Sequence, residues 1–65
     1  MADRFKVVIN HEEQYSIVPL DQVLMRGQRE VGVEGRGEEC LRHVEQVWTT
    51  MRSIDRERLR REIGL

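Results

Sequence analysis

The sequence has little of several residues that define common classes of protein. Its single cysteine, Cys40, has no second cysteine with which to form an internal disulfide, and such usage is typical of a reducing compartment. Only one proline is present, and phenylalanine, tyrosine and tryptophan each occur once. No apolar run approaches the roughly 20 residues that a membrane-spanning helix needs. We therefore expect no membrane partner.

Neither sign of charge predominates. The chain has 11 lysine and arginine residues against 12 aspartate and glutamate residues, which gives a formal net charge of -1. Proteins that bind nucleic acid or anionic membranes generally need an excess of basic residues. The segment from Met1 to Arg4 lacks the apolar region of a signal peptide. We expect residues 1 to 3 to be frayed and the protein to be cytoplasmic.

The chain is short. Its 65 residues form one small domain, 1–65, with a thin core. That length leaves no room for a substrate cleft with its own supporting groups, so an independent enzyme is not expected. Charged residues make up 35% and apolar residues 38% of the chain, which is compatible with a soluble protein that still packs a core.

Alternating apolar and polar residues predict three antiparallel β-strands, at about residues 4–10, 14–18 and 28–34. The first two form a hairpin around the polar turn 11–13, and the second ends at Pro19, which has no N–H for a ladder. The alternation also separates two faces of the sheet. The predicted core face consists of Phe5, Val7, Ile9, Tyr15, Ile17, Val31 and Val33.

Residues 20–27 connect the second and third strands. We expect a loop over the edge of the core, although the spacing of Leu20, Val23 and Leu24 also fits a single helical turn. Gly27 permits a turn, and Gly32 indicates a bulge in the third strand.

The clearest predicted element is an amphipathic helix at about residues 38–51. Its apolar stripe is formed by Cys40, Leu41, Val44, Val47, Trp48 and Met51. Acidic residues begin this segment and Arg52 lies near its expected end, as the helix dipole favours.

A second helix is predicted at about residues 54–63. Ser53 is the expected N-cap and Gly64 the residue that follows the C-cap. Its apolar residues are few, and we expect the helix to be loosely held. The predicted fold is therefore α+β, in the order β-β-β-α-α, with the first helix packed on one face of a three-stranded antiparallel sheet.

Four groups of residues are candidates for metal binding, catalysis or phosphate binding. Cys40 and His43 are half of a metal site, but only His11 remains to complete it, so no metal is expected. Cys40, His43 and Glu45 resemble a nucleophile, base and orienting group, but nothing supplies an oxyanion hole.

The other two groups are charged. Glu12 and Glu13 lie in a turn where neither burial nor a partner shifts a pKa, so we interpret them as solvated charges. The last helix carries four arginines interleaved with acidic residues, which favours a salt-bridged surface over a phosphate-binding one. These arginines are Arg56, Arg58, Arg60 and Arg61.

The residues alone thus indicate a small interaction protein without catalytic machinery. Trp48 is interpreted as a core residue, with an interface anchor as the alternative. The face of the sheet that the helix leaves uncovered is the candidate docking surface. It carries Val8, Ser16, Val18 and Gln28.

The stretch from residue 10 to residue 19 resembles the signature Asn-x-Glu-x-Gln-x-Ser-Leu-Trp-Pro of the MbtH-like proteins, the small partners of nonribosomal peptide synthetases. Ile17 replaces the leucine and Val18 the tryptophan. The matching residues are Asn10, Glu12, Gln14, Ser16 and Pro19.

Two later stretches extend the resemblance without a gap. The Pro-x-Gly-Trp turn of the family corresponds to residues 25–28, where Gly27 is kept and Gln28 replaces the tryptophan. The family's Trp-Thr-Asp-x-Arg-Pro ending corresponds to residues 48–53. Matching positions in this half are Leu41, Val44, Glu45, Trp48, Thr49 and Arg52.

The resemblance implies a non-catalytic protein without a cofactor or a small-molecule ligand of its own. It implies binding to the adenylation domain of a synthetase, away from its active site, where the family aids folding or solubility and promotes activation of an amino acid by ATP. A family pocket for a small apolar side chain would fall at Ser16, Val18 and Gln28.

The expected docking residues are Ser16, Val18, Pro19, Gln28, Gln14 and Val8. The other matched positions are expected to have structural roles: Asn10, Glu12, Gly27, Leu41, Glu45, Trp48, Thr49 and Arg52. Two alternatives remain. One is a structural subunit of another complex that has no effect on adenylation, and the other is a small regulator that binds nucleic acid through the last helix.

Overall fold

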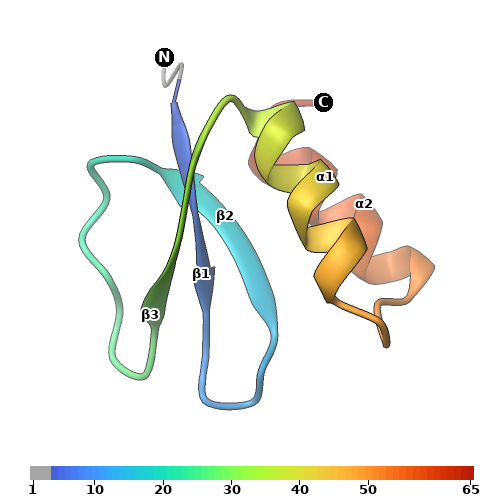
Figure 1. The fold of residues 1–65 in the computed structure, drawn as a ribbon, viewed down its shortest axis with the longest axis horizontal. Helices are drawn as coiled ribbons and strands as arrows, with labels where there is room; N and C mark the ends of the chain where they lie inside the picture. The colour runs from blue at the N-terminus through green and yellow to red at the C-terminus, as the bar shows by residue number, and fades with distance from the viewer. Residues whose placement is uncertain (1–3) are drawn as a thin grey trace.

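The computed structural model describes residues 4–65, so the expectation for residues 1 to 3 lies outside the described range. Three antiparallel strands in one sheet are followed by two helices, which confirms the predicted α+β order (Figure 1). The elements are β1 (Phe5–Ile9), β2 (Tyr15–Pro19), β3 (Arg29–Gly35), α1 (Gly37–Val47) and α2 (Ser53–Glu62).

Strand β1 is the centre of the sheet, which has the order β2-β1-β3. All five of its residues are buried. Its pairing with β2 places Val7 opposite Ile17 and Val8 opposite Ser16. Odd-numbered side chains of both strands therefore share the face toward the helices, as the alternation predicted.

Asn10 organises the hairpin turn between β1 and β2. Its Oδ1 accepts the backbone N–H groups of Glu12 at 2.9 Å and of Gln14 at 3.0 Å. Its carbonyl accepts the N–H of Glu13, whose φ of 62° is the one positive value among the non-glycine residues that the structure describes. Hydrogen bonds to the Asn10 side chain thus stabilise a turn that lacks an Asn-Gly pair.

Strand β3 carries a bulge. Between the pairs Lys6–Glu34 and Val8–Glu30 the register shifts, so three residues of β3 lie opposite Val7. Gly32, with φ of 92°, lies within this segment, which agrees with its predicted bulge. The assignment of both β3 valines to the core was wrong in part, because Val33 packs on the core but Val31 is 38% exposed.

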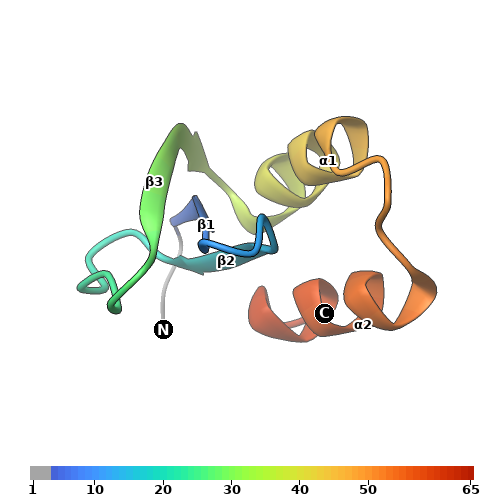
Figure 2. The ribbon, with the colours of Figure 1, turned by 90° about the horizontal axis from the view of Figure 1, so that it is seen from below.

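Helix α1 crosses the sheet and closes the core. Cys40, Leu41 and Val44 are its buried residues and pack with Phe5, Val7 and Ile17 from the strands. Both helices lie on the same side of the sheet, as Figure 2 shows. The Glu39 carboxylate accepts the Arg36 backbone N–H at 3.0 Å and so stabilises the start of the helix.

Helix α1 ends four residues earlier than predicted. Trp48 is its C-cap, and Met51 lies in the connection to α2, where it is half-buried against the core. Thr49 and Thr50 are β-branched and lose side-chain freedom in a helix, which favours a break there. Arg52 consequently does not belong to the last turn of α1.

Helix α2 begins at Ser53, with Arg52 as its N-cap, so the predicted Ser53 cap was wrong by one residue. The Asp55 carboxylate accepts the Arg52 backbone N–H at 2.9 Å. Gly64 follows the C-cap of α2, as predicted. The φ of Gly64 is 84°, and the N–H groups of the last two residues donate to carbonyls of the last helical turn. Leu59 is fully buried, which anchors α2 to the core.

Candidate protein-docking surface

The face of the sheet away from the helices consists of three short rows. The β1 row is Lys6 and Val8. On β2, Val18 and Ser16 lie beside them, and on β3, Glu34 and Glu30 do so. Strand alternation predicts that Ser16, Val18 and Val8 share this face, which the pairing confirms, and it assigns Glu30 to the same face.

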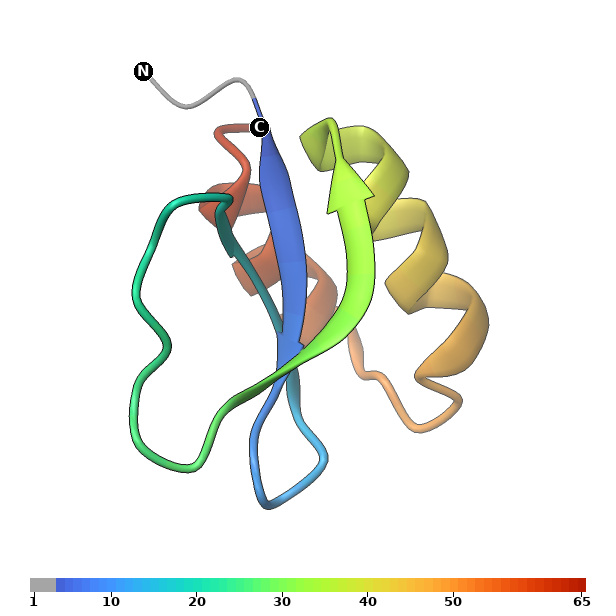
Figure 3. The same ribbon diagram turned by 60° about the vertical axis from the view of Figure 1, so that its left-hand side comes forward.

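The middle row of this face is buried. Val8 is 0% exposed and Lys6 is 6% exposed. The Lys6 ammonium lies 3.6 Å from a carboxylate oxygen of Glu30. The connection between β2 and β3 is drawn on this side of the sheet (Figure 3), and its Leu20 and Leu24 are half-buried. Val8 is therefore a packing residue, and its prediction as a docking residue was wrong because its side chain is buried.

Helix α2 seals the outer edge of β2. Glu62 accepts the backbone N–H of Ile17 at 2.9 Å, and Arg58 donates to the Tyr15 carbonyl at 2.7 Å and to Ser16 Oγ at 3.2 Å. Arg58 and Glu62 also form an ion pair at 2.8 Å. An unpaired strand edge is a template for association with other chains, and these two side chains occupy it. Ser16 is half-buried as a result.

The remaining predicted docking residues lie at the end of β2 and beyond it. Val18 is half-buried on the outer face. Pro19 pairs with Phe5 and has the parity of the opposite face. Gln28 is half-buried, and its Oε1 accepts the Met25 backbone N–H at 2.9 Å. Gln28 therefore closes the turn at Gly27, whose φ is 84°.

The connection between β2 and β3 also carries the most exposed apolar side chains of the described chain. Val23 is 84% and Met25 is 67% exposed. Exposed apolar groups beside a half-buried surface are typical of a contact area. Both residues belong to the connection predicted at residues 20–27, and the apolar character of that connection is the signal available in the sequence.

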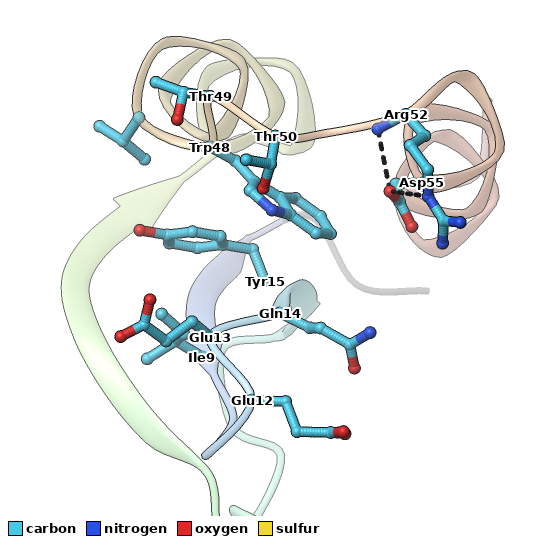
Figure 4. A pocket seen from close by; sticks show the side chains of 11 residues that line it. Ile9, Glu12, Glu13, Gln14, Tyr15, Trp48, Thr49, Thr50, Arg52 and Asp55 are labelled. Carbon is cyan, nitrogen blue, oxygen red and sulfur yellow. Dashed lines mark hydrogen bonds and ion pairs between the residues drawn. The ribbon is translucent and has the colours of Figure 1, made fainter.

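Gln14 has a different place from Ser16 and Val18. Its side-chain oxygen accepts the Asn10 amide at 3.1 Å, so it supports the hairpin turn. It also lines a pocket of about 430 Å³ on the helix side of the molecule (Figure 4). Tyr15 and Trp48 lie side by side in this pocket, with ring centroids 5.6 Å apart and an angle of 47° between the rings.

The pocket brings together residues from both ends of the chain. One wall belongs to the hairpin, and the other to the connection between the helices and the start of α2. The lining residues are Ile9, Glu12, Glu13, Gln14, Tyr15, Val47, Trp48, Thr49, Thr50, Arg52 and Asp55. Val47, predicted as part of the buried stripe, is exposed here.

Cys40, which the candidate metal and nucleophile groups share, lies in the core. Burial raises the pKa of the Cys40 thiol, and the charges of Glu39 and Glu34 raise it further. The thiol is therefore protonated at neutral pH and packs in the core. Among residues 4–65, no three histidine, cysteine or acidic side chains are arranged to hold a metal ion, and no helix is long and apolar enough to cross a membrane.

Two of the four arginines of α2 pair with carboxylates. Arg56 pairs with Glu45 at 2.9 Å and Arg58 with Glu62. This agrees with the predicted salt-bridged surface, and it gives Glu45 a partner in the other helix. Glu57 and Arg61, which are spaced four residues apart on α2, are not among the ion pairs of the described residues.

Comparison with protein families identifies the chain. The model of the MbtH-like protein family matches residues 1–60. The chain belongs to the MbtH-like family. This confirms the resemblance drawn from the signature residues. A comparison with curated proteins gives no match.

Eight of the positions that this MbtH-like protein shares with the signature fall into two groups. Asn10 and Gly27 shape turns, and Leu41 lies in the core. Several others line the pocket, namely Glu12, Gln14, Trp48, Thr49 and Arg52. Residues of the first and last matched stretches thus meet in space on the face opposite to Val18 and Gln28.

Proposed function

We propose that this MbtH-like protein is a non-catalytic, cytoplasmic partner of a nonribosomal peptide synthetase. It binds the adenylation domain away from the active site, aids its folding or solubility, and promotes adenylation of the amino acid. The observation that carries the proposal is the family match over residues 1–60.

The proposed contact surface is the outer face around Val18 and Gln28, extended by Val23 and Met25. Val18 is half-buried and the two residues of the connection are exposed and apolar. Where the family has two tryptophans, this surface has Val18 and Gln28. Two rings grip a small side chain on both sides, whereas valine and a turn-bound glutamine form a shallower surface. We infer a narrow range of synthetase partners.

The test is amino-acid-dependent pyrophosphate exchange by a cognate adenylation domain, measured with and without this protein. Stimulation together with co-purification is the expected result. Met25→Glu places a charge on the exposed contact surface and should reduce the stimulation. Ile54→Glu is the matched control, because Ile54 is also an exposed apolar residue but lies on α2.

Three outcomes contradict the proposal. Exchange that is the same with and without the protein, for a synthetase encoded beside it, contradicts the activating role. Equal loss of stimulation by Met25→Glu and Ile54→Glu contradicts the location of the contact. Equal activation of many unrelated adenylation domains contradicts the narrow range.

A further inference from the structure

The pocket between the hairpin and the two helices is separate from the proposed adenylation-domain surface. Its volume of about 430 Å³ lies within the range of ligand pockets, roughly 300–1,000 Å³. In Figure 4, Glu12 and Gln14 point from the hairpin toward the side on which Arg52 and Asp55 lie, with the Trp48 ring between the two walls.

Acidic groups outnumber basic groups in this pocket. Glu12, Glu13 and Asp55 line it together with a single basic residue, Arg52. Arg52 is already paired with Asp55, since its Nε lies 3.4 Å from Asp55 Oδ2. Among the described residues no ion pair involves Glu12 or Glu13. The pocket therefore has an excess of negative charge.

Asp55 contributes a carboxylate oxygen that is not in use. The residue is 9% exposed, and both of its contacts with Arg52, from the backbone N–H and from Nε, are made by Oδ2. Within residues 4–65, no hydrogen bond reaches Oδ1. Asp55 lines the pocket, and a carboxylate with an unused acceptor oxygen favours a hydrogen-bond donor with positive charge.

The aromatic groups favour the same kind of occupant. The faces of the Tyr15 and Trp48 rings carry negative electrostatic potential and attract cations, tryptophan most strongly. A guanidinium group is flat, stacks on aromatic rings and donates several hydrogen bonds in one plane. An ammonium group matches the charge of the pocket but lacks the flat shape.

The walls are too open to enclose a free small molecule. Glu12, Glu13, Gln14, Thr49 and Thr50 are all exposed, whereas ligand pockets commonly bury most of the ligand surface. A side chain carried by a protein is held by contacts around the pocket as well as inside it. The turn that carries Glu12 is fixed by the Asn10 hydrogen bonds, so this wall is formed before binding.

We propose that this pocket is a second docking site, which receives an arginine side chain from a protein partner. The guanidinium lies against Trp48, donates to Asp55 Oδ1 and pairs with Glu12. This site lies on the helix side of the molecule, and its proposal does not depend on the adenylation-domain contact on the outer face.

The test uses the isolated full-length chain and NMR titration of its single tryptophan. The probes are acetyl-Gly-Arg-Gly-amide and the same peptide with citrulline, which has nearly the same shape without the charge. The arginine peptide should shift the Trp48 indole N–H resonance and bind about tenfold more tightly than the citrulline peptide. Glu12→Gln should weaken the binding about threefold.

Glu38→Gln is the control, because Glu38 is an exposed glutamate in the first turn of α1 that does not line the pocket. It should leave the binding unchanged. The proposal is overturned if arginine and citrulline peptides bind equally, if neither shifts the Trp48 signal at the highest soluble concentration, or if both glutamine variants have the same effect. Equally tight binding of free arginine overturns the docking role. None of these outcomes bears on pyrophosphate exchange, so failure here leaves the proposed function standing.

Discussion

Gly37, the first residue of α1, lies directly against Ile63 at the end of α2. An ideal Cβ on Gly37 would be 2.6 Å from the Ile63 Cβ and 3.0 Å from its Cγ2. Real Cβ atoms do not approach other carbons so closely, so one of the helices must move if residue 37 has a side chain. The close approach holds the start of one helix to the end of the other.

Gly37→Ala should therefore destabilise the protein. We expect a loss of about 1–3 kcal/mol in the free energy of unfolding, because the added methyl group overpacks a helix contact. Urea denaturation monitored by circular dichroism measures it. Arg42→Ala, at an exposed position of the same helix, should change the value by no more than about 0.5 kcal/mol. Equal effects of the two variants would show that the contact is not tight.

Glu62→Ala removes the acceptor for the half-buried N–H of Ile17 on the edge of β2. The unpaired N–H, and the loss of the ion pair with Arg58, should cost about 1–3 kcal/mol of stability. Glu57→Ala is the matched control on the same helix, because Glu57 is exposed. The opened strand edge should also increase self-association, which sedimentation velocity detects. A Glu62 variant as stable and as monomeric as the Glu57 variant would contradict the sealing role.

Asp55 should make the stability sensitive to acid. The Arg52 backbone N–H that it accepts holds the pKa of its carboxyl below the ordinary value of 3.8. The unfolded chain, with an ordinary pKa, binds the proton first, so this contribution is present above about pH 5 and is lost as the pH falls toward the folded-state pKa. Asp55→Asn should flatten that part of a stability curve measured from pH 7 to pH 3.

The exposed Asp21 provides the control for this experiment. Asp21→Asn should leave the slope of stability against pH close to that of the unsubstituted protein. A curve for Asp55→Asn that falls as steeply between pH 5 and pH 3 would show that the Arg52 contact does not contribute to the acid sensitivity.

Val18→Trp together with Gln28→Trp should broaden the range of adenylation domains that the protein activates. Two large rings would restore a pocket for a small apolar side chain on the outer face. Pyrophosphate exchange with a panel of synthetases measures the range, and Ile54→Trp, an exposed position on α2, controls for added aromatic surface. No change with any synthetase would mean that the adenylation domain contacts another surface.

The order of elements and most of the core were predictable because they depend on local periodicity. Alternation placed Phe5, Val7 and Ile17 on one face, and helical spacing placed Leu41 and Val44 against them. These residues are all buried in the structure. Such patterns are repeated several times within an element, so a single exception does not change the assignment.

The ends of the helices were less predictable. The apolar stripe continues to Met51, yet α1 ends at Val47, because Trp48 turns toward Tyr15 and the two threonines that follow disfavour a helix. Met51 still contacts the core from the connection. Helical spacing of an apolar residue therefore did not require that the residue be helical.

The candidate docking surface was only partly predictable. Strand alternation grouped Ser16 with Val18, but alternation cannot show that Val8 is fully buried. The sequence also held no sign that Arg58 would reach Ser16, 42 residues away in the chain. Contacts of this kind depend on where α2 is placed in three dimensions.

The central position of β1 affects how the protein forms during translation. Strand β1 precedes both of the strands that pair with it, so it leaves the ribosome before either partner. The β1–β2 hairpin can form early, because its turn contains its own hydrogen bonds. The edge of β1 that pairs with β3, and its apolar face toward the helices, remain exposed until Gly35 and then α1 emerge. The interval between synthesis of β1 and synthesis of α1 is therefore the one in which misfolding is most favoured.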